Sequence, residues 1–256
     1  MAHPPKKKAK YAAAPPRKRD FHVRQVYHIY QRGSRQQTVF RTRAQLIGYL
    51  DHFDRLARRY RVRVHAFCLM SNHVHFVLEP LIKWGISHLM QHLQSHYARQ
   101  IHQSLGLTGH LWRNHFHCKH IQSSSQYRAT VLYVEQNSTA AGIAKRAHLY
   151  DYSSAPAHAK NLTHHKLIHQ HHQCEVRLYL TRWHKEFPDH ANWANWLRSP
   201  RDAAHQAELA EIERILGTDR LQPQKQIPLP PCYSAPQTQS ATTGSTHPIS
   251  HGWTRQ

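Results

Sequence analysis

Two strongly apolar segments lie within residues 62–80, separated only by the polar pair Ser71-Asn72. In the first segment, apolar side chains alternate from Val62 to Cys68, as they do along a half-buried strand. The second segment, HVHFVLEP, begins directly after the polar pair. Two such segments joined by a tight turn predict a β-hairpin. The other strands and helices are expected before and after this hairpin.

The flanking segments alternate between strand and helix patterns. A polar turn, Gln31 to Ser34, closes the first strand pattern, and serine hydroxyls at residues 123–125 provide an N-cap for the last helix. The expected elements are a strand at 24–30, a helix at 43–60, the hairpin, a helix at 86–105, a strand at 116–122 and a helix from 124 to about 141. The order β-α-β-β-α-β plus one helix predicts an α+β, ferredoxin-like fold.

Composition divides the rest of the chain. Residues 1–20 hold four prolines and seven basic side chains, and residues 222–256 hold six prolines among Gln, Ser and Thr. Such segments bury too little apolar surface to offset the entropy of ordering, so both tails are expected to be disordered. One domain is expected at 21–158, followed by a helical C-terminal region at 159–221 with a helix near 201–216.

The charge balance indicates an acidic partner. Lysine and arginine total 35 against 14 aspartates and glutamates, a formal net charge of +21 with neutral histidine. Nucleic acid is the leading candidate, whereas no basic amphipathic helix and no membrane-length apolar run favour a lipid surface. No apolar segment follows the basic N-terminus, so no secretory signal is predicted and a cytoplasmic location is expected.

The cysteines exclude two further classes of protein. Cys68, Cys118, Cys174 and Cys232 contain no Cys-x-x-Cys pair, which argues against a zinc ribbon or finger. A disulfide framework is not expected without a secretory signal. We therefore expect reduced thiols.

His73 and His75 are candidate metal ligands. Two residues apart on a strand, their imidazoles project from one face, while Val74 points to the other. Neutral imidazoles bind divalent metals well. The pattern alone is weak in a chain with 27 histidines, since His-x-His recurs at 115–117 and 169–171. The apolar hairpin gives His73 and His75 more weight, because buried imidazoles without partners are costly.

Tyr133 and Asn137 are four residues apart and share one face of the last expected helix. An asparagine oxygen can complete a metal site, and a metal can hold a phosphate in front of a phenol. The alternatives are a tyrosine packed in the core and an asparagine that caps the helix or lies on its surface.

Five segments of the chain occur in the same order in a known family. Residues 66–75 (AFCLMSNHVH) match a hairpin A-x-x-L-M-x-N-H-x-H, and residues 27–33 (YHIYQRG) match a first strand that ends in an R-G turn. Residues 109–116 (GHLWRNHF), 133–137 (YVEQN) and 151–154 (DYSS) match the segments G-H-L-W-x-x-R-F, Y-x-x-x-N and W-S-S. Together these segments resemble the single-tyrosine HUH transposases, which include the IS200-like and the REP-associated tyrosine transposases.

The resemblance implies roles for individual residues. The metal histidines of the family correspond to His73 and His75, its third metal ligand to Asn137, and its nucleophile to Tyr133. All four residue types are retained.

The chain departs from the family at other positions. The family's N-P-V-R-A-G is NSTAAG at residues 137–142, the arginine before its phenylalanine is His115, and the tryptophan of W-S-S is Tyr152. These changes affect DNA contacts and the end of the helix. They leave the proposed nucleophile and the three proposed metal ligands unchanged.

The resemblance also implies a reaction. Single-tyrosine HUH transposases cut and rejoin single-stranded DNA, often beside a hairpin, through a 5′-phosphotyrosine link with the aid of Mg²⁺ or Mn²⁺. Two histidines and one amide form a softer site than magnesium usually takes, so Mn²⁺ is a reasonable ligand here. The expected protein is a monomer or homodimer that acts on single-stranded or hairpin DNA and associates with the nucleoid in the bacterial cytoplasm.

The charge map agrees with this interpretation. Residues 80–134 contain no aspartate or glutamate, although a carboxylate-based transposase or a two-metal nuclease needs such residues. Arg32, Arg35, Arg113 and Lys119 are the expected DNA contacts, with a solvated surface charge as the alternative for each.

Two other functions remain open. The chain could be a DNA-binding protein of the same fold that no longer cuts. It could also be a histidine-rich metal-binding protein that uses the tract at 158–172, although a polar, partly protonated surface is the simpler interpretation of that tract. Trp112 and Phe116 could stack on unpaired bases or pack in the core.

Overall fold

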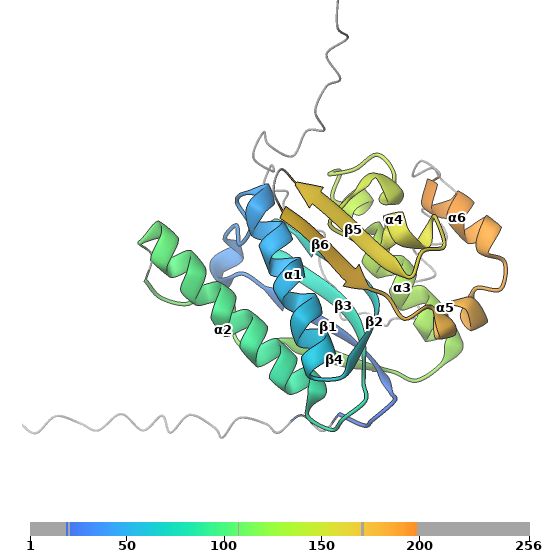
Figure 1. Cartoon of the computed structure of the whole chain (residues 1–256), viewed down its shortest axis with the longest axis horizontal. Helices are drawn as coiled ribbons and strands as arrows, with labels where there is room; N and C mark the ends of the chain where they lie inside the picture. Colours follow the sequence, from blue (N-terminus) through green and yellow to red (C-terminus); the bar gives the residue numbers. More distant parts are fainter. Residues whose placement is uncertain (1–18, 20, 107, 170–171, 199–256) are drawn as a thin grey trace, which may run out of the picture.

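The computed structural model describes residues 19, 21–106, 108–169 and 172–198 (Figure 1). The two tails expected to be disordered, 1–20 and 222–256, lie outside the described residues apart from Arg19, as does the helix expected near 201–216. Among the helices that are described, none is long and apolar enough to cross a membrane.

Four antiparallel strands form the central sheet in the order β2-β3-β1-β4. The strands are β1 (Val26–Arg32), β2 (Val62–Met70), β3 (His73–Pro80) and β4 (His117–Ile121). Helix α1 (Arg43–Arg59) joins β1 to β2, and α2 (Gly85–Leu105) joins β3 to β4. This order and these connections confirm the predicted α+β, ferredoxin-like fold.

Local chemistry sets the ends of the elements. Ser71-Asn72 forms the turn between β2 and β3. Thr42 and Gln45 form a capping box at the start of α1. The hydroxyl of Ser123 accepts a hydrogen bond from the backbone N–H of Gln126 and so begins α3 (Ser124–Ala140), the helix that carries Tyr133 and Asn137.

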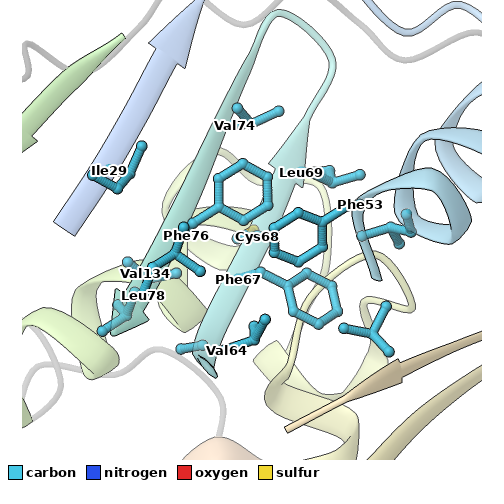
Figure 2. Close-up of a cluster of buried hydrophobic side chains, with 14 of the residues drawn as sticks. Ile29, Phe53, Val64, Phe67, Cys68, Leu69, Val74, Phe76, Leu78 and Val134 are labelled. Carbon is cyan, nitrogen blue, oxygen red and sulfur yellow. The ribbon is translucent and has the colours of Figure 1, made fainter. Parts of the chain in front are cut away.

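The two faces of the sheet bury different residues. On β3, Val74 and Phe76 face α1 and α2, and the ring of Phe76 stacks on Phe53 of α1 with centroids 4.4 Å apart. Figure 2 shows these side chains with others of the apolar core. His73 and His75 project from the opposite face, as alternation along a strand requires. That face is covered by α3, which packs on β2 and β3.

The chain after α3 includes a hairpin that the sequence did not predict. Its elements are η2 (Ala147–Leu149), α4 (Ala155–His158), β5 (His164–His169), β6 (His172–Arg177), α5 (Leu180–Glu186) and α6 (His190–Arg198). The helical expectation for 159–221 is therefore wrong over 164–169 and 172–177. Leu167, Cys174 and Val176 are buried while their neighbours Lys166 and Glu175 are exposed, which is the alternation of strands. The many histidines obscured this alternation, because His165 occupies a buried position.

The C-terminal segments cover the outer edge of β2. The N–H of Leu69 donates to the carbonyl of Tyr152 (2.9 Å), and the N–H of Ser154 donates to the carbonyl of Phe67 (2.9 Å). Further along, the N–H of Tyr179 donates to the carbonyl of Val64 (2.7 Å). An edge strand without such partners would invite pairing with other chains, so these contacts protect the sheet.

Gly33 is expected to tolerate no larger side chain. It follows β1, and its N–H donates to the carbonyl of Asn72 at the β2–β3 turn (2.7 Å). A Cβ at Gly33 would lie 2.6 Å from the backbone oxygen of Gln37. Gly33→Ala should therefore lower the free energy of unfolding by about 1–3 kcal/mol, as overpacking does, in a urea titration.

The matched control for this substitution is Gly48→Ala. Gly48 lies on the exposed side of α1, and a Cβ there meets nothing within 4 Å. Alanine should raise the free energy of unfolding by up to about 1 kcal/mol, because it forms helix better than glycine. A shift of both variants in the same direction would argue against the close contact at Gly33.

Candidate active site

Pairing between β1 and β3 builds the floor of the site. Tyr30 lies opposite His75, and Arg32 lies opposite His73, so these side chains share one face of the sheet. His28 shares that face two residues before Tyr30. Neither His28 nor Tyr30 was predicted to be a site residue. The alternation of YHIYQR indicates that His28, Tyr30 and Arg32 share one face of a strand. The sequence does not show the register of that strand with β3, which brings them to His73 and His75.

Tyr133 reaches this floor from α3. Its half-buried ring meets the ring of His75 edge-on, with centroids 5.6 Å apart, and that of His28, with centroids 5.9 Å apart. The proposed nucleophile and one proposed metal ligand are therefore neighbours in the fold, although they come from a helix and a strand far apart in the sequence.

Hydrogen bonds fix the orientation of both histidines. Nδ1 of His73 donates to Oδ1 of Asn72 (2.7 Å), which leaves Nε2 with its lone pair. Nδ1 of His75 lies 3.0 Å from Nε2 of His28. When His75 donates in this pair, its own Nε2 is likewise left as an electron-pair donor. Such outer partners are typical of metal-binding histidines.

Burial keeps these imidazoles neutral. Desolvation, followed by the positive charge of Arg32, lowers the pKa of His73 to about 3. Desolvation and then Lys119 lower the pKa of His28 to about 4. The pKa of His75 lies well below its ordinary value, again mainly because of burial. The neutral ring is the form that binds a metal ion.

Asn137 lies one helical turn after Tyr133. Its Nδ2 donates to the carbonyl of Tyr133 (2.7 Å), so the side chain is bonded back to its own helix and Oδ1 is the atom left for a ligand. No hydrogen bond joins Asn137 to His73 or His75, all of which lie in the described chain. Within that same part, no three His, Cys, Asp or Glu side chains form a metal cluster, so a three-ligand site here requires the amide oxygen. Two imidazole nitrogens and one amide oxygen fit a divalent cation.

The predicted DNA-binding residues differ in their placement. Arg32 is half-buried, and burial followed by the charge of Arg113 lowers its pKa; it also interacts with Tyr133. Lys119 on β4 is exposed and lies opposite His28. Arg32 and Lys119 therefore share the face of the sheet that Tyr133 contacts. Arg35 is exposed in the turn after β1, and no described contact links it to Tyr133.

A buried polar cluster anchors the opposite side of α3. Oε1 of Glu135 accepts hydrogen bonds from the hydroxyl of Ser154 (2.5 Å) and from Nδ1 of His158 (2.5 Å). His165, also buried, bonds the carbonyl of Asp151. The expectation of a polar surface for the histidine tract is therefore wrong for His158 and His165. Because Glu135 lies between Tyr133 and Asn137 in the sequence, this cluster sets the rotation of the helix that presents them.

A comparison with protein families gives one match. The family model described as "Transposase IS200 like" matches residues 22–137, which run from just before β1 to Asn137. This range contains His73, His75 and Tyr133.

Two further comparisons complete this picture. No curated protein matches the chain. Among solved structures, the chain is similar to a REP-associated tyrosine transposase bound to a REP hairpin, with 16% sequence identity and a TM-score of 0.44. The match covers 54% of this chain and 80% of that chain.

Acid is expected to destabilise the metal-free fold through His28 and His73. An unfolded histidine has a pKa near 6.5, whereas the folded values are about 4 and about 3. Between pH 6.5 and 4 the unfolded state therefore binds protons at these two histidines, whereas the folded state does not. The stabilisation is complete above pH 6.5 and is lost as pH falls toward 4, by about 1.4 kcal/mol per pH unit for each histidine.

Urea titrations between pH 7.5 and 4.5 in the presence of a chelator test this slope. His28→Gln should flatten it, since one titrating group is removed. His92→Gln, at an exposed position on α2, is the matched control and should keep the wild-type slope. If the free energy of unfolding depends equally on pH in wild type, His28→Gln and His92→Gln, the lowered pKa of His28 is contradicted.

Proposed function

Through residues 22–137 the chain belongs to the IS200-like transposase family, and on that premise we propose that it cleaves and rejoins single-stranded DNA through Tyr133. The strands it acts on carry hairpins, as the sequence resemblance implies. We assign the catalytic role to residues 21–158, because α3 is held by Ser154 and His158 beyond the family match.

The contact of Tyr133 with His75 carries this proposal. A phenol next to two neutral imidazoles, those of His28 and His75, with the charge of Arg32 acting on it, suits an attack on a phosphate. A core tyrosine would be buried, whereas Tyr133 is half-buried at the face where the predicted ligands meet.

The proposed reaction is a transesterification. The Oη atom of Tyr133 attacks the phosphorus, the bond from phosphorus to the 3′ oxygen breaks, and the DNA 5′ end becomes linked to the tyrosine. The proton lost by the phenol is balanced by the proton that the 3′ oxygen gains. Attack by a 3′ hydroxyl on the phosphotyrosine reverses the step and joins strands without ATP, since the phosphodiester energy is kept.

The residues around Tyr133 have separate tasks. The charge of Arg32, which interacts with Tyr133, would stabilise the negative charge that develops on Oη. Arg113 and Lys119 are exposed and suited to hold the strand by its phosphates. His73, His75 and Asn137 would hold a divalent cation, Mg²⁺ or Mn²⁺, which supplies Lewis-acid polarisation of the phosphate when bound.

One chain provides both the tyrosine and the histidines. The contacts of Tyr133 with His28 and His75 lie within the same copy. This arrangement is compatible with a monomer or a homodimer, and it needs no residue from a second copy to bring the nucleophile to the proposed metal ligands.

Tyr133→Phe should abolish a covalent protein–DNA adduct. The change removes only the attacking oxygen, so binding of the oligonucleotide should remain. Wild-type protein is incubated with hairpin-bearing single-stranded oligonucleotides and Mn²⁺ or Mg²⁺, with and without EDTA, and adducts are separated by denaturing electrophoresis. We expect adducts from wild type with metal and none with EDTA.

Tyr60→Phe is the matched control, because Tyr60 is a half-buried tyrosine at the end of α1, away from the site. It should form adducts at the wild-type level. Adducts that persist in Tyr133→Phe would remove Tyr133 as the nucleophile. Binding without any adduct from wild type would favour a DNA-binding protein that no longer cuts.

Lys119→Gln and Arg113→Gln should weaken DNA binding and also its dependence on salt. Each phosphate contact to a single strand contributes about 0.7 to the slope of log affinity against log salt concentration. Each variant should therefore reduce the slope by about 0.7, measured by fluorescence anisotropy. Arg55→Gln, on an exposed part of α1, is the control and should leave the slope unchanged. Unchanged slopes in the first two variants would place the DNA elsewhere.

A further inference from the structure

His28 is a buried histidine on β1 that has no role in the proposed reaction. Its ring lies beside those of Tyr30 and Tyr133, and the residue is 5% exposed. Its Nε2 lies 3.0 Å from Nδ1 of His75, one of the proposed metal ligands. This contact bears on how His75 presents its other ring nitrogen to a cation.

The rings of His28 and His75 meet edge to edge. Their planes are 17° apart, and their centroids are 5.2 Å apart, which is much longer than the 3.0 Å between the two nitrogens. The two nitrogens therefore lie between the ring centres, and a proton on one of them points toward the lone pair of the other. This is the geometry of an N–H···N hydrogen bond and not of face-to-face stacking.

Only one proton can lie between the two nitrogens. Burial lowers the pKa of His28 to about 4 and the pKa of His75 well below its ordinary value, so both rings are neutral at neutral pH. A neutral imidazole has one N–H and one lone pair. When His75 donates from Nδ1, its Nε2 keeps the lone pair. When His28 donates from Nε2, the proton of His75 lies on Nε2, and that nitrogen cannot bind a metal ion.

The surroundings of His75 favour the arrangement in which it donates to His28. His75 is 1% exposed, and no hydrogen bond joins its Nε2 to any of the described residues. A proton on this nitrogen would be a buried donor without an acceptor in that part of the chain, which is unfavourable. A lone pair on the same nitrogen is satisfied when a cation binds. The cation and this arrangement therefore stabilise each other.

His73 has no such choice of arrangement. Its Nδ1 donates to Oδ1 of Asn72, and a carboxamide oxygen can only accept. The partner of His75 is instead an imidazole, which can accept or donate. The side chain at position 28 thus decides which nitrogen of His75 is left for a ligand.

We propose that His28 is a positioning residue: its Nε2 accepts the Nδ1–H of His75 and so keeps Nε2 of His75 as a lone pair for the cation. The proposal rests on the proposed function for the presence of a cation at His73, His75 and Asn137. His28 needs no contact of its own with the cation or the DNA.

Titration of the full chain with Mn²⁺ in a calorimeter tests the effect on the cation site. His28→Phe keeps a ring beside Tyr30 and Tyr133 but removes the acceptor, so the Mn²⁺ affinity should fall about 10- to 100-fold. His28→Gln retains an acceptor oxygen near the position of Nε2 and should stay within about threefold of wild type. His117→Phe is the matched control, because His117 is an exposed histidine whose ring stacks on Tyr30, and it should keep the wild-type affinity.

A second readout needs neither metal nor DNA. Long-range ¹H–¹⁵N spectra of the metal-free protein with labelled histidine show which ring nitrogen carries the proton, and His75→Gln assigns the signals of His75. We expect the proton of His75 on Nδ1 in wild type, in His28→Gln and in His117→Phe. In His28→Phe, which offers no acceptor to Nδ1, the proton should shift toward Nε2.

Three results would overturn the proposal. They are a proton on Nε2 of His75 in metal-free wild type, equal Mn²⁺ affinity in His28→Phe and wild type, and a loss of affinity in His28→Gln as large as that in His28→Phe. Urea titrations verify that both variants are folded. If His28→Phe does not fold, the wild-type spectrum and the affinity of His28→Gln decide.

The adduct assay separates this proposal from the proposed function. If wild type forms no adduct while the spectra and affinities follow the expectation, cleavage by Tyr133 fails and the role of His28 stands. If adducts form and His28→Phe binds Mn²⁺ as wild type does, only the role of His28 fails.

Discussion

The antiparallel pairing of β1 with β3 is the interaction on which the rest of the site depends. It sets His28 and Tyr30 beside the two histidines of the β2–β3 hairpin and turns Gln31 to the other face. A shift of one residue in this register would exchange the faces, so that imidazoles would enter the apolar core and phenylalanine would face α3. The packing of Phe76 on Phe53 opposes such a shift, which means that the apolar core fixes the position of the polar site.

The second requirement is the orientation of α3. This helix has polar groups on two sides, with Tyr133 against His75 of the sheet and Glu135 toward the segment at 152–158. A buried carboxylate without hydrogen-bond donors is unfavourable. The orientation of α3 is therefore restricted to one in which Ser154 and His158 can donate to Glu135. The ring of His158 in turn stacks on Trp183, which extends the support of the helix to α5.

The sequence was sufficient for the order of the elements in the main domain, because periods of two and of 3.6 residues, together with Ser71-Asn72 and Ser123, are local signals. It was also sufficient to select His73, His75, Tyr133 and Asn137 as a set, through the family resemblance. It could not provide the partners of these residues. His28 reaches His75, and Ser154 reaches Glu135, only through strand register and chain folding. The β5–β6 hairpin was missed because histidines occupy both a half-buried position (His164) and a buried one (His165) there, which conceals the alternation.

The way in which the C-terminal segments close the edge of β2 bears on where this folding unit ends. The family match stops at Asn137, yet the backbone partners of Leu69 and Phe67 and the donors to Glu135 all come later in the chain. A protein truncated at the end of the match would keep every proposed chemical group and still carry an open strand edge and an uncompensated buried carboxylate. The position of the helix that carries Tyr133 therefore depends on the segment at 152–158, although no residue of that segment is proposed to touch DNA.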